Sequence, residues 1–275
     1  MSTTAVGRTR SSDGTEIGWQ RMGAGPPLVL VHGSMADHTC WSAVAPLLAT
    51  AFELVMIDRR GRGLSRARGD RHDLDSEVAD LRAVLEAVGR PAAICAWSYG
   101  AVVALEAVLD GLPCTGLVLY EPPLPGQTAG QPPGFRQEFA RLADAGEHET
   151  AAVLFLTSVM RLPPPVVEVM RQFPLWPVAV AGVPAARWEA TVLDDYRYDA
   201  ARVRSCAVPA TVLAGTASPA HLVEASERLA RDLPSGHLVR LAGQHHFAHL
   251  SDPGRFAAAV GAALATGSGG GTGAP

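Results

Sequence analysis

Short, mostly apolar runs alternate with helix-compatible segments along most of this 275-residue chain. Such a run is typical of a strand that is covered on both faces, as the strands of a parallel sheet are. Alternation of these runs with helices predicts an α/β fold with a doubly wound, mostly parallel sheet. The runs that we interpret as strands are Leu28–His32, Leu54–Asp58, Ala92–Trp97, Gly116–Tyr120, Ala210–Ala214 and His237–Leu241.

Two stretches depart from this alternation. Val6–Ser11 and Glu16–Met22 flank a turn signal that contains Gly14, and together they predict an N-terminal hairpin. After the fourth apolar run, proline clusters separate amphipathic helical pieces and no strand-like run occurs, which predicts a helical cap inserted into the sheet domain. The predicted division is a core of residues 1–121 and 202–266, a cap of residues 122–201 and a flexible tail of residues 267–275.

Composition limits the partners and the chemistry that we expect. The formal net charge of −4 argues against a nucleic-acid partner, and no apolar stretch approaches the roughly 20 residues of a membrane span. The N-terminus lacks the basic and apolar regions of a signal peptide, so we predict a cytoplasmic protein. Every basic residue is an arginine, which excludes a mechanism that needs a lysine amine. The four cysteines are widely spaced, so we expect reduced thiols and no metal site.

A serine stands where one apolar run ends and a helical segment begins, in Ala96-Trp97-Ser98-Tyr99-Gly100. A sharp strand-to-helix turn strains its central residue and tolerates only small residues two positions away on either side, here Ala96 and Gly100. Ser98 would then lie at a helix N-terminus, where free amides and the helix dipole favour developing negative charge. The usual pattern has glycine in the place of Ala96, so the pentapeptide taken alone also fits an ordinary loop serine.

Four segments, in this order and spacing, resemble the α/β-hydrolase superfamily over residues 6–264. They are Leu30-Val31-His32-Gly33-Ser34, Asp58-Arg59-Arg60-Gly61-Arg62-Gly63-Leu64-Ser65, Ala96-Trp97-Ser98-Tyr99-Gly100 and His246-Phe247-Ala248-His249-Leu250. The resemblance implies that Ser98 is the nucleophile and that the backbone N–H groups of Ser34 and Tyr99 form the oxyanion hole. It favours a structural role for His32 and for the turn at 58–65.

The base has to be a histidine that reaches the Ser98 hydroxyl, because a neutral serine is a poor nucleophile without proton removal. Three of the nine histidines, His245, His246 and His249, lie in the loop after the last predicted strand. His246 best matches the family position, because it precedes the Phe-x-His-Leu-x-x-Pro pattern. His245 is the alternative, one residue earlier.

The carboxylate that would pair with the histidine is missing from its usual place in the sequence. Most of the superfamily carries it after the strand that we interpret as Ala210–Ala214, where this chain has Ser218. A serine cannot hold a full negative charge against an imidazolium. The second location known in the superfamily, after the strand that follows the nucleophile helix, holds Glu121, which we predict to be the acid. Asp252 and Asp199 are alternatives, and Glu121 would otherwise only anchor the cap.

The resemblance implies a serine hydrolase that cleaves an ester, lactone or thioester without a metal or a cofactor. Apolar side chains of the cap and of the loops near Ser98 would bind a small to medium apolar substrate, although core packing is an alternative role for the cap aromatics. These residues are Met35, Trp97, Phe155, Met160, Trp176 and Trp188. Ser218 leaves a second hypothesis, a fold that serves as a ligand-binding protein or as a non-hydrolytic natural-product tailoring enzyme. The composition also suggests an actinobacterial source.

Overall fold

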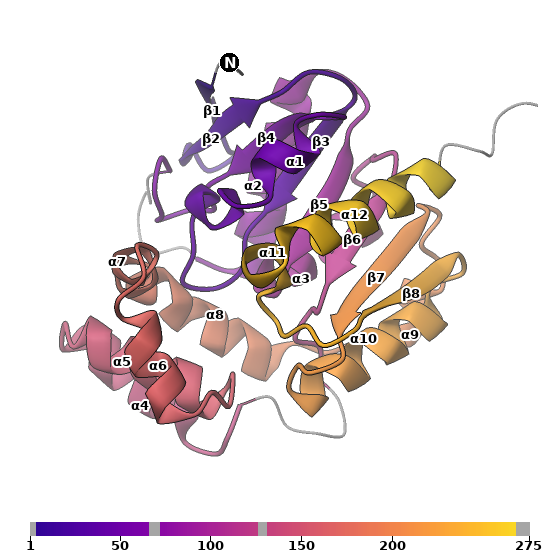
Figure 1. Cartoon of the computed structure of the whole chain (residues 1–275). Helices are drawn as coiled ribbons and strands as arrows, with labels where there is room; N and C mark the ends of the chain where they lie inside the picture. Colours follow the sequence, from indigo (N-terminus) through magenta and orange to yellow (C-terminus); the bar gives the residue numbers. More distant parts are fainter. Residues whose placement is uncertain (1–3, 66–71, 126–130, 268–275) are drawn as a thin grey trace, which may run out of the picture.

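Eight strands form one sheet in the computed structural model, which describes residues 4–65, 72–125 and 131–267 (Figure 1). Their order is β1-β2-β4-β3-β5-β6-β7-β8, and every neighbouring pair from β4 onward is parallel. Because only β2 runs antiparallel to its neighbours β1 and β4, the predicted mostly parallel sheet is confirmed. The strands are β1 (Ala5–Arg10), β2 (Glu16–Met22), β3 (Pro27–Val31), β4 (Glu53–Ile57), β5 (Ala93–Trp97), β6 (Leu117–Tyr120), β7 (Ala210–Gly215) and β8 (Gly236–Leu241).

Both faces of the central strands are buried, which explains their continuous apolar sequence. Val29 and Val31 of β3 belong to one apolar cluster with α2, α3 and α10, whereas Leu28 and Leu30 belong to a second cluster with α1 and α12. Side chains of a strand point alternately to its two faces, so one short run supplies both clusters. These helices are α1 (Ala45–Leu48), α2 (Leu74–Val88), α3 (Tyr99–Leu109), α10 (Ala220–Asp232) and α12 (Pro253–Gly267), with the short η1 (His38–Trp41) and α11 (Ala248–Ser251) beside them.

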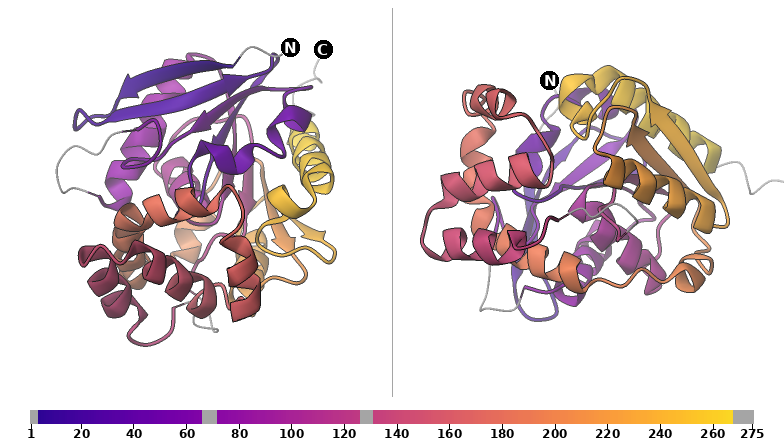
Figure 2. Two further views of the ribbon diagram at one scale, coloured as in Figure 1. Left: turned by 60° about the vertical axis from the view of Figure 1, so that its left-hand side comes forward. Right: turned by 90° about the horizontal axis from the view of Figure 1, so that it is seen from below.

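A group of helices follows β6 and precedes β7, where the proline-rich stretch predicted a cap. The helices are α4 (Phe135–Asp144), α5 (His148–Ser158), α6 (Pro164–Met170), α7 (Trp176–Ala181), α8 (Val183–Asp195) and α9 (Ala200–Val203). Figures 1 and 2 show α4 to α8 gathered as a separate layer at one end of the sheet. This layer has an apolar cluster of its own, which also takes in Met35 from the loop after β3 and Leu222 from α10. The cap is therefore seated on the core through shared apolar contacts.

The end of the chain differs slightly from its prediction. Gly267, the first residue of the predicted flexible tail, still belongs to α12, and the rest of that tail lies outside the described residues. Within the described ranges, no helix combines the length and the apolar character needed to cross a bilayer.

Candidate active site

Ser98 occupies the bend between β5 and α3 in a backbone conformation that few residues adopt. Its φ of 57° and ψ of −127° place it in a region that costs a non-glycine residue of the order of 1–3 kcal/mol. The surroundings enforce the bend. A side chain at Gly100 would collide with the carbonyl oxygen of His32, and a Cβ on Gly33 would lie 2.8 Å from the Cβ of Ser98. Ala96, in contrast, fits fully buried within β5, so the sharp turn forms without a glycine at that position.

Glu121 lies directly after β6 and contacts His246. Its Oε2 atom is 2.5 Å from Nδ1 of His246, and its Oε1 atom accepts a hydrogen bond of 2.5 Å from the backbone N–H of Gly215. Glu121 is 0% exposed and His246 is 2% exposed, so water does not compete for these bonds. Ser98 and His246 line the same two hollows, described below. The structure thus brings together the three residues that we predicted as nucleophile, base and acid.

The other candidates for base and acid lie elsewhere. The backbone carbonyl of His245 accepts a hydrogen bond from the Tyr120 hydroxyl, whereas the imidazole that contacts Glu121 is that of His246. Asp252 accepts from the backbone N–H of Arg255 in the first turn of α12, and Asp199 caps α9. The described residues offer the Ser218 hydroxyl no partner, although it is buried.

The loop after β3 is held against Ser98 by Arg59. The guanidinium of Arg59 donates to the carbonyl oxygens of His32 and Gly33, at 3.2 and 3.0 Å. His32 uses both ring nitrogens in the same place, because Nε2 accepts from the backbone N–H of Arg59 at 3.0 Å and Nδ1 donates to the carbonyl of Gly33 at 2.8 Å. Burial, with the nearby arginines, lowers the pKa of His32 to about 3, so the ring is neutral. These bonds position Ser34 beside the bend.

A buried ion network connects this loop to the cap. Arg59 donates from Nε to Oε2 of Glu77 at 2.6 Å, and both Arg59 and Arg62 donate to Oε1 of Glu189 on α8. All four side chains are almost completely buried. Removing one member of such a network leaves an uncompensated buried charge, which typically costs about 3–5 kcal/mol.

Two groups of side chains among the described residues could in principle hold a metal ion, Asp37 with His38 and Asp58, and His72 with Glu77 and Glu189. Both are already engaged. Asp58 accepts from the backbone N–H groups of His38 and Leu64, each at 2.6 Å. Glu77 and Glu189 are paired with arginines. Asp58 therefore stabilises the turn at 58–65, and Glu77 and Glu189 help to hold the cap on the core.

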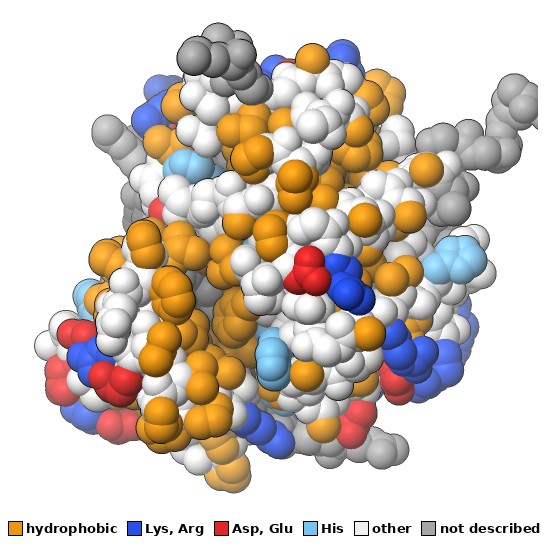
Figure 3. All heavy atoms as spheres, viewed as in Figure 1, with side chains coloured by type: hydrophobic (Ala, Val, Ile, Leu, Met, Phe, Trp, Pro, Cys, Tyr) orange, Lys and Arg blue, Asp and Glu red, His pale blue; other side chains and the backbone are white. Residues whose placement is uncertain are grey.

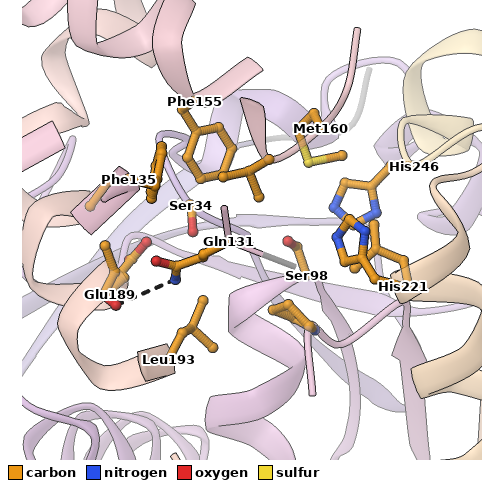
Figure 4. Close-up of a pocket in the computed structure, with 15 residues that line it drawn as sticks. Ser34, Ser98, Gln131, Phe135, Phe155, Met160, Glu189, Leu193, His221 and His246 are labelled. Atoms are coloured by element: carbon orange, nitrogen blue, oxygen red, sulfur yellow. Dashed lines mark hydrogen bonds between the residues drawn. The ribbon is translucent and has the colours of Figure 1, made fainter. Parts of the chain in front are cut away.

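Ser98 stands at the junction of two hollows of different size and character. The larger has a volume of about 530 Å³ and lies between the cap and the core, where Figure 3 shows apolar side chains around a depression. Its lining is mostly apolar and includes five of the predicted substrate-binding residues: Met35, Trp97, Phe155, Met160 and Trp176. The smaller, of about 30 Å³, lies under α8 and carries more polar groups (Figure 4).

Trp188, the sixth predicted substrate-binding residue, lies away from both hollows. It stands on α8 beneath the guanidinium of Arg187 and lines a separate hollow with Glu106 and Tyr196. The residues of α8 that border the small hollow are Ala186, Glu189, Ala190 and Leu193. Trp188 is two residues from both Ala186 and Ala190, roughly 200° around the helix axis, so it faces another way.

Comparisons with known proteins identify the family of this fold. Residues 28–259 match the alpha/beta hydrolase family. The chain belongs to that family. An alpha/beta hydrolase from Sphaerobacter thermophilus DSM 20745 is 32% identical with a TM-score of 0.86, over 94% of this chain and 100% of that one. An esterase from Rhodococcus sp. ECU1013 is 25% identical with a TM-score of 0.74, over 95% and 98%.

Curated relatives of this α/β hydrolase match over shorter stretches. A pimeloyl-[acyl-carrier protein] methyl ester esterase of Methylococcus capsulatus is 44% identical over 31% of this chain and 32% of its own length. An N-formylmaleamate deformylase of Pseudomonas putida is 35% identical over 46% of this chain and 48% of its own length. The match thus spans between about a third and a half of these relatives.

Several residues that line the small hollow were not predicted from the sequence, among them Gln131, Glu189 and His221. His221, in the first turn of α10, lines the small hollow beside Ser98 and His246. It is 4% exposed, and burial, with the nearby charge of Arg161, lowers its pKa to about 4. The available signal was its place just after β7, at the sheet edge where sites of α/β proteins assemble.

Proposed function

We propose that this chain is a serine hydrolase that cleaves carboxylic esters by means of Ser98, His246 and Glu121. The observation that carries the proposal is the buried contact of 2.5 Å between Glu121 and Nδ1 of His246, next to the strained bend that presents Ser98. An acid in this position holds the imidazole in the tautomer whose free Nε2 can accept a proton, and it stabilises the imidazolium that results.

The reaction then follows in two halves. The Ser98 oxygen attacks the ester carbonyl while Nε2 of His246 takes the hydroxyl proton, and the backbone N–H groups of Ser34 and Tyr99 bind the oxyanion. When the tetrahedral intermediate collapses, the C–O bond of the ester breaks and His246 returns the proton to the departing alcohol. A water molecule, deprotonated by His246, then attacks the acyl-enzyme and releases the carboxylic acid together with free Ser98.

The substrate class follows from the large hollow. A mostly apolar space of about 530 Å³ favours an ester with an apolar arm of small to medium size. Similarity to an esterase of known structure and to a methyl ester esterase supports ester cleavage over other acyl transfers. The alternative hypothesis of a protein without full catalysis rested on Ser218, and the contact between Glu121 and His246 supports the hydrolase over it.

The proposal is tested with a fluorophosphonate probe, which phosphonylates activated serines. We expect the probe to label the wild type and not Ser98→Ala, and we expect hydrolysis of p-nitrophenyl esters only by the wild type. Circular dichroism of both proteins controls for folding. A folded wild type that neither reacts with the probe nor hydrolyses any ester from acetate to octanoate would overturn the proposed function.

A further inference from the structure

The small hollow combines a position beside the nucleophile with polar atoms that lack partners. Ser34, Ser98 and His246 line it from the core, and Gln131 and Glu189 line it from the cap side (Figure 4). Within the described residues, Oε2 of Glu189, Oε1 of Gln131 and both ring nitrogens of His221 have no hydrogen-bond partner. We call these three residues the polar recess.

Leaving such atoms unpaired is costly. A buried polar group without a hydrogen bond typically costs about 1–3 kcal/mol, and the recess contains four such atoms on three side chains. Glu189 is 1% exposed and His221 is 4% exposed, so bulk water does not solvate them. A wall with this many free acceptors next to a reactive group is typical of a binding site whose bonds are completed by the ligand.

The charges around the recess restrict the ligand. The other oxygen of Glu189 accepts from Arg59 and Arg62, so two guanidiniums offset the charge of the carboxylate. His221 is neutral near pH 7, because its pKa is lowered to about 4 by burial, with a further contribution from Arg161. A neutral imidazole offers one donor and one acceptor, whereas the free oxygens of Glu189 and Gln131 only accept. A hydroxyl group donates one hydrogen bond and accepts up to two, so it can accept from the imidazole N–H and donate to one of the free oxygens. An anionic group would be repelled by the free oxygen of Glu189.

The size of the recess restricts the ligand further. Its volume is about 30 Å³, against about 530 Å³ for the apolar hollow on the other side of Ser98. One water molecule needs roughly 10–15 Å³ of such space, so the recess takes two waters or an arm of a few atoms. An ester bound at Ser98 has two arms, one on each side of its carbonyl carbon. The large hollow suits an apolar arm, and the small recess suits a short arm that carries a hydroxyl group.

We propose that His221 donates a hydrogen bond to a hydroxyl group on the short arm of the substrate and that Oε1 of Gln131 accepts one from it, while the apolar arm fills the large hollow. The inference rests on the proposed ester hydrolysis and names the class of ester, a short hydroxylated arm joined to an apolar one. Gln131 and His221 are specificity-determining and take no part in proton transfer at Ser98.

Two matched pairs of esters test this inference. Hexyl glycolate and hexyl propionate differ by a hydroxyl in place of a methyl on the acyl arm, and 2-hydroxyethyl hexanoate and propyl hexanoate differ in the same way on the alcohol arm. For each pair we define the hydroxyl preference as the ratio of kcat/KM values. The intrinsic reactivity of each ester is the same for every enzyme variant, so a change in the ratio between wild type and variant reports on the recess alone.

We expect the hydroxyl preference of one pair to fall about tenfold in Gln131→Leu and in His221→Leu, as loss of one buried hydrogen bond predicts. The conservative variant His221→Gln, which keeps a donor and an acceptor, should retain most of the preference. Gln137→Leu, which replaces an exposed glutamine of the same cap, is the matched control and should leave both ratios unchanged. Glu189 is not varied in this experiment, because its loss also disturbs the ion network.

The outcomes separate this inference from the proposed function. Hydrolysis of the hexanoate esters with equal ratios in the wild type and in both leucine variants would overturn the polar recess and leave the esterase intact; the free atoms would then bind only water. Failure of the wild type to hydrolyse any of the four esters or to react with the fluorophosphonate would overturn the proposed function itself. Equal thermal unfolding of wild type and variants controls for misfolding.

Discussion

The candidate active-site cavity has a wall formed by the core and a wall formed by the cap. The two walls differ in whether their polar atoms have hydrogen-bond partners. On the core wall, Glu121 bonds to His246 and to the Gly215 amide, and His32 uses both of its ring nitrogens. On the cap wall, the free oxygens of Glu189 and Gln131 lack partners among the described residues. Apart from His221 of α10, whose ring nitrogens also lack partners among the described residues, the core wall is therefore fixed before substrate arrives, whereas the cap wall has bonds left to make. It follows that turnover should depend on the core wall and substrate discrimination on the cap wall.

The largest effect is expected on the core wall, at the acid. Glu121→Gln keeps the shape of the side chain but cannot hold a negative charge against His246. We expect kcat for a p-nitrophenyl ester to fall by about 10³–10⁴, as the loss of an orienting acid does in comparable sites. The half-buried Asp252, which accepts from Arg255, provides the matched control Asp252→Asn and should keep kcat near the wild-type value. A larger loss in Asp252→Asn than in Glu121→Gln would reverse our assignment of the acid.

The second-largest effect is expected in the buried ion network that joins the core wall to the cap wall. Glu189→Ala should lower the free energy of unfolding by about 3–5 kcal/mol, because it leaves the buried guanidiniums of Arg59 and Arg62 without their shared carboxylate. Urea denaturation measures the change. Glu168→Ala removes an exposed ion pair with Arg171 from the same cap and should change stability little. Equal losses in the two variants would mean that burial of the network does not matter.

The third prediction concerns His249, a buried histidine of the core that lacks hydrogen-bond partners among the described residues. The described residues provide no partner for either ring nitrogen of His249, which packs against Trp41, Trp97 and Phe256. Burial lowers its pKa from an ordinary 6.5 to about 3, so the unfolded chain binds a proton below pH 6.5 that the folded chain does not take up until about pH 3. The folded state therefore loses stability as the pH falls through that window.

His249→Leu should thus remove about 2 kcal/mol of the stability loss between pH 8 and pH 5. Urea denaturation at several pH values gives the slope. His237→Leu, at an exposed histidine of β8, controls for the loss of a histidine as such. Identical slopes for wild type and His249→Leu would show that the ring is protonated in the folded protein.

The smallest effect is expected in the apolar part of the cap wall. Trp176→Ala should raise KM for p-nitrophenyl hexanoate about tenfold with little change in kcat, because it removes apolar contact from the large hollow without touching the reacting groups. Trp188→Ala is the matched control, since Trp188 lines another hollow. If both variants changed KM equally, the cap wall would not be the part of the cavity that we describe.

The core could be predicted from the sequence because its strands are buried on both faces. The run of β3 is apolar at Leu28, Val29, Leu30 and Val31 alike, and this pattern needs no knowledge of distant residues. The position of Glu121 was predictable for a related reason, since the end of β6 must lie at the edge of the sheet that also holds Ser98. Its contact with His246 joins residues 125 positions apart, and only the fold brings them together.

The cap could be predicted only as a set of helices. Trp176 and Trp188 are both aromatic residues of cap helices, and no local pattern says which of them faces the nucleophile. The sequence also could not predict that polar atoms of Glu189 and His221 lack hydrogen-bond partners, because this depends on how the neighbouring helices pack. Packing of one element on another decides both questions.

Arg59 contributes to both walls at once, since it donates to the carbonyl oxygens beside Ser98 and to Glu189 on α8. A substitution that shifts α8 to fit a new substrate should therefore also displace the loop after β3, which we propose to bind the oxyanion. Affinity and turnover cannot be optimised one after the other in this chain. Directed evolution of its cap should select for both in the same round, or include position 59 in every library that varies α8.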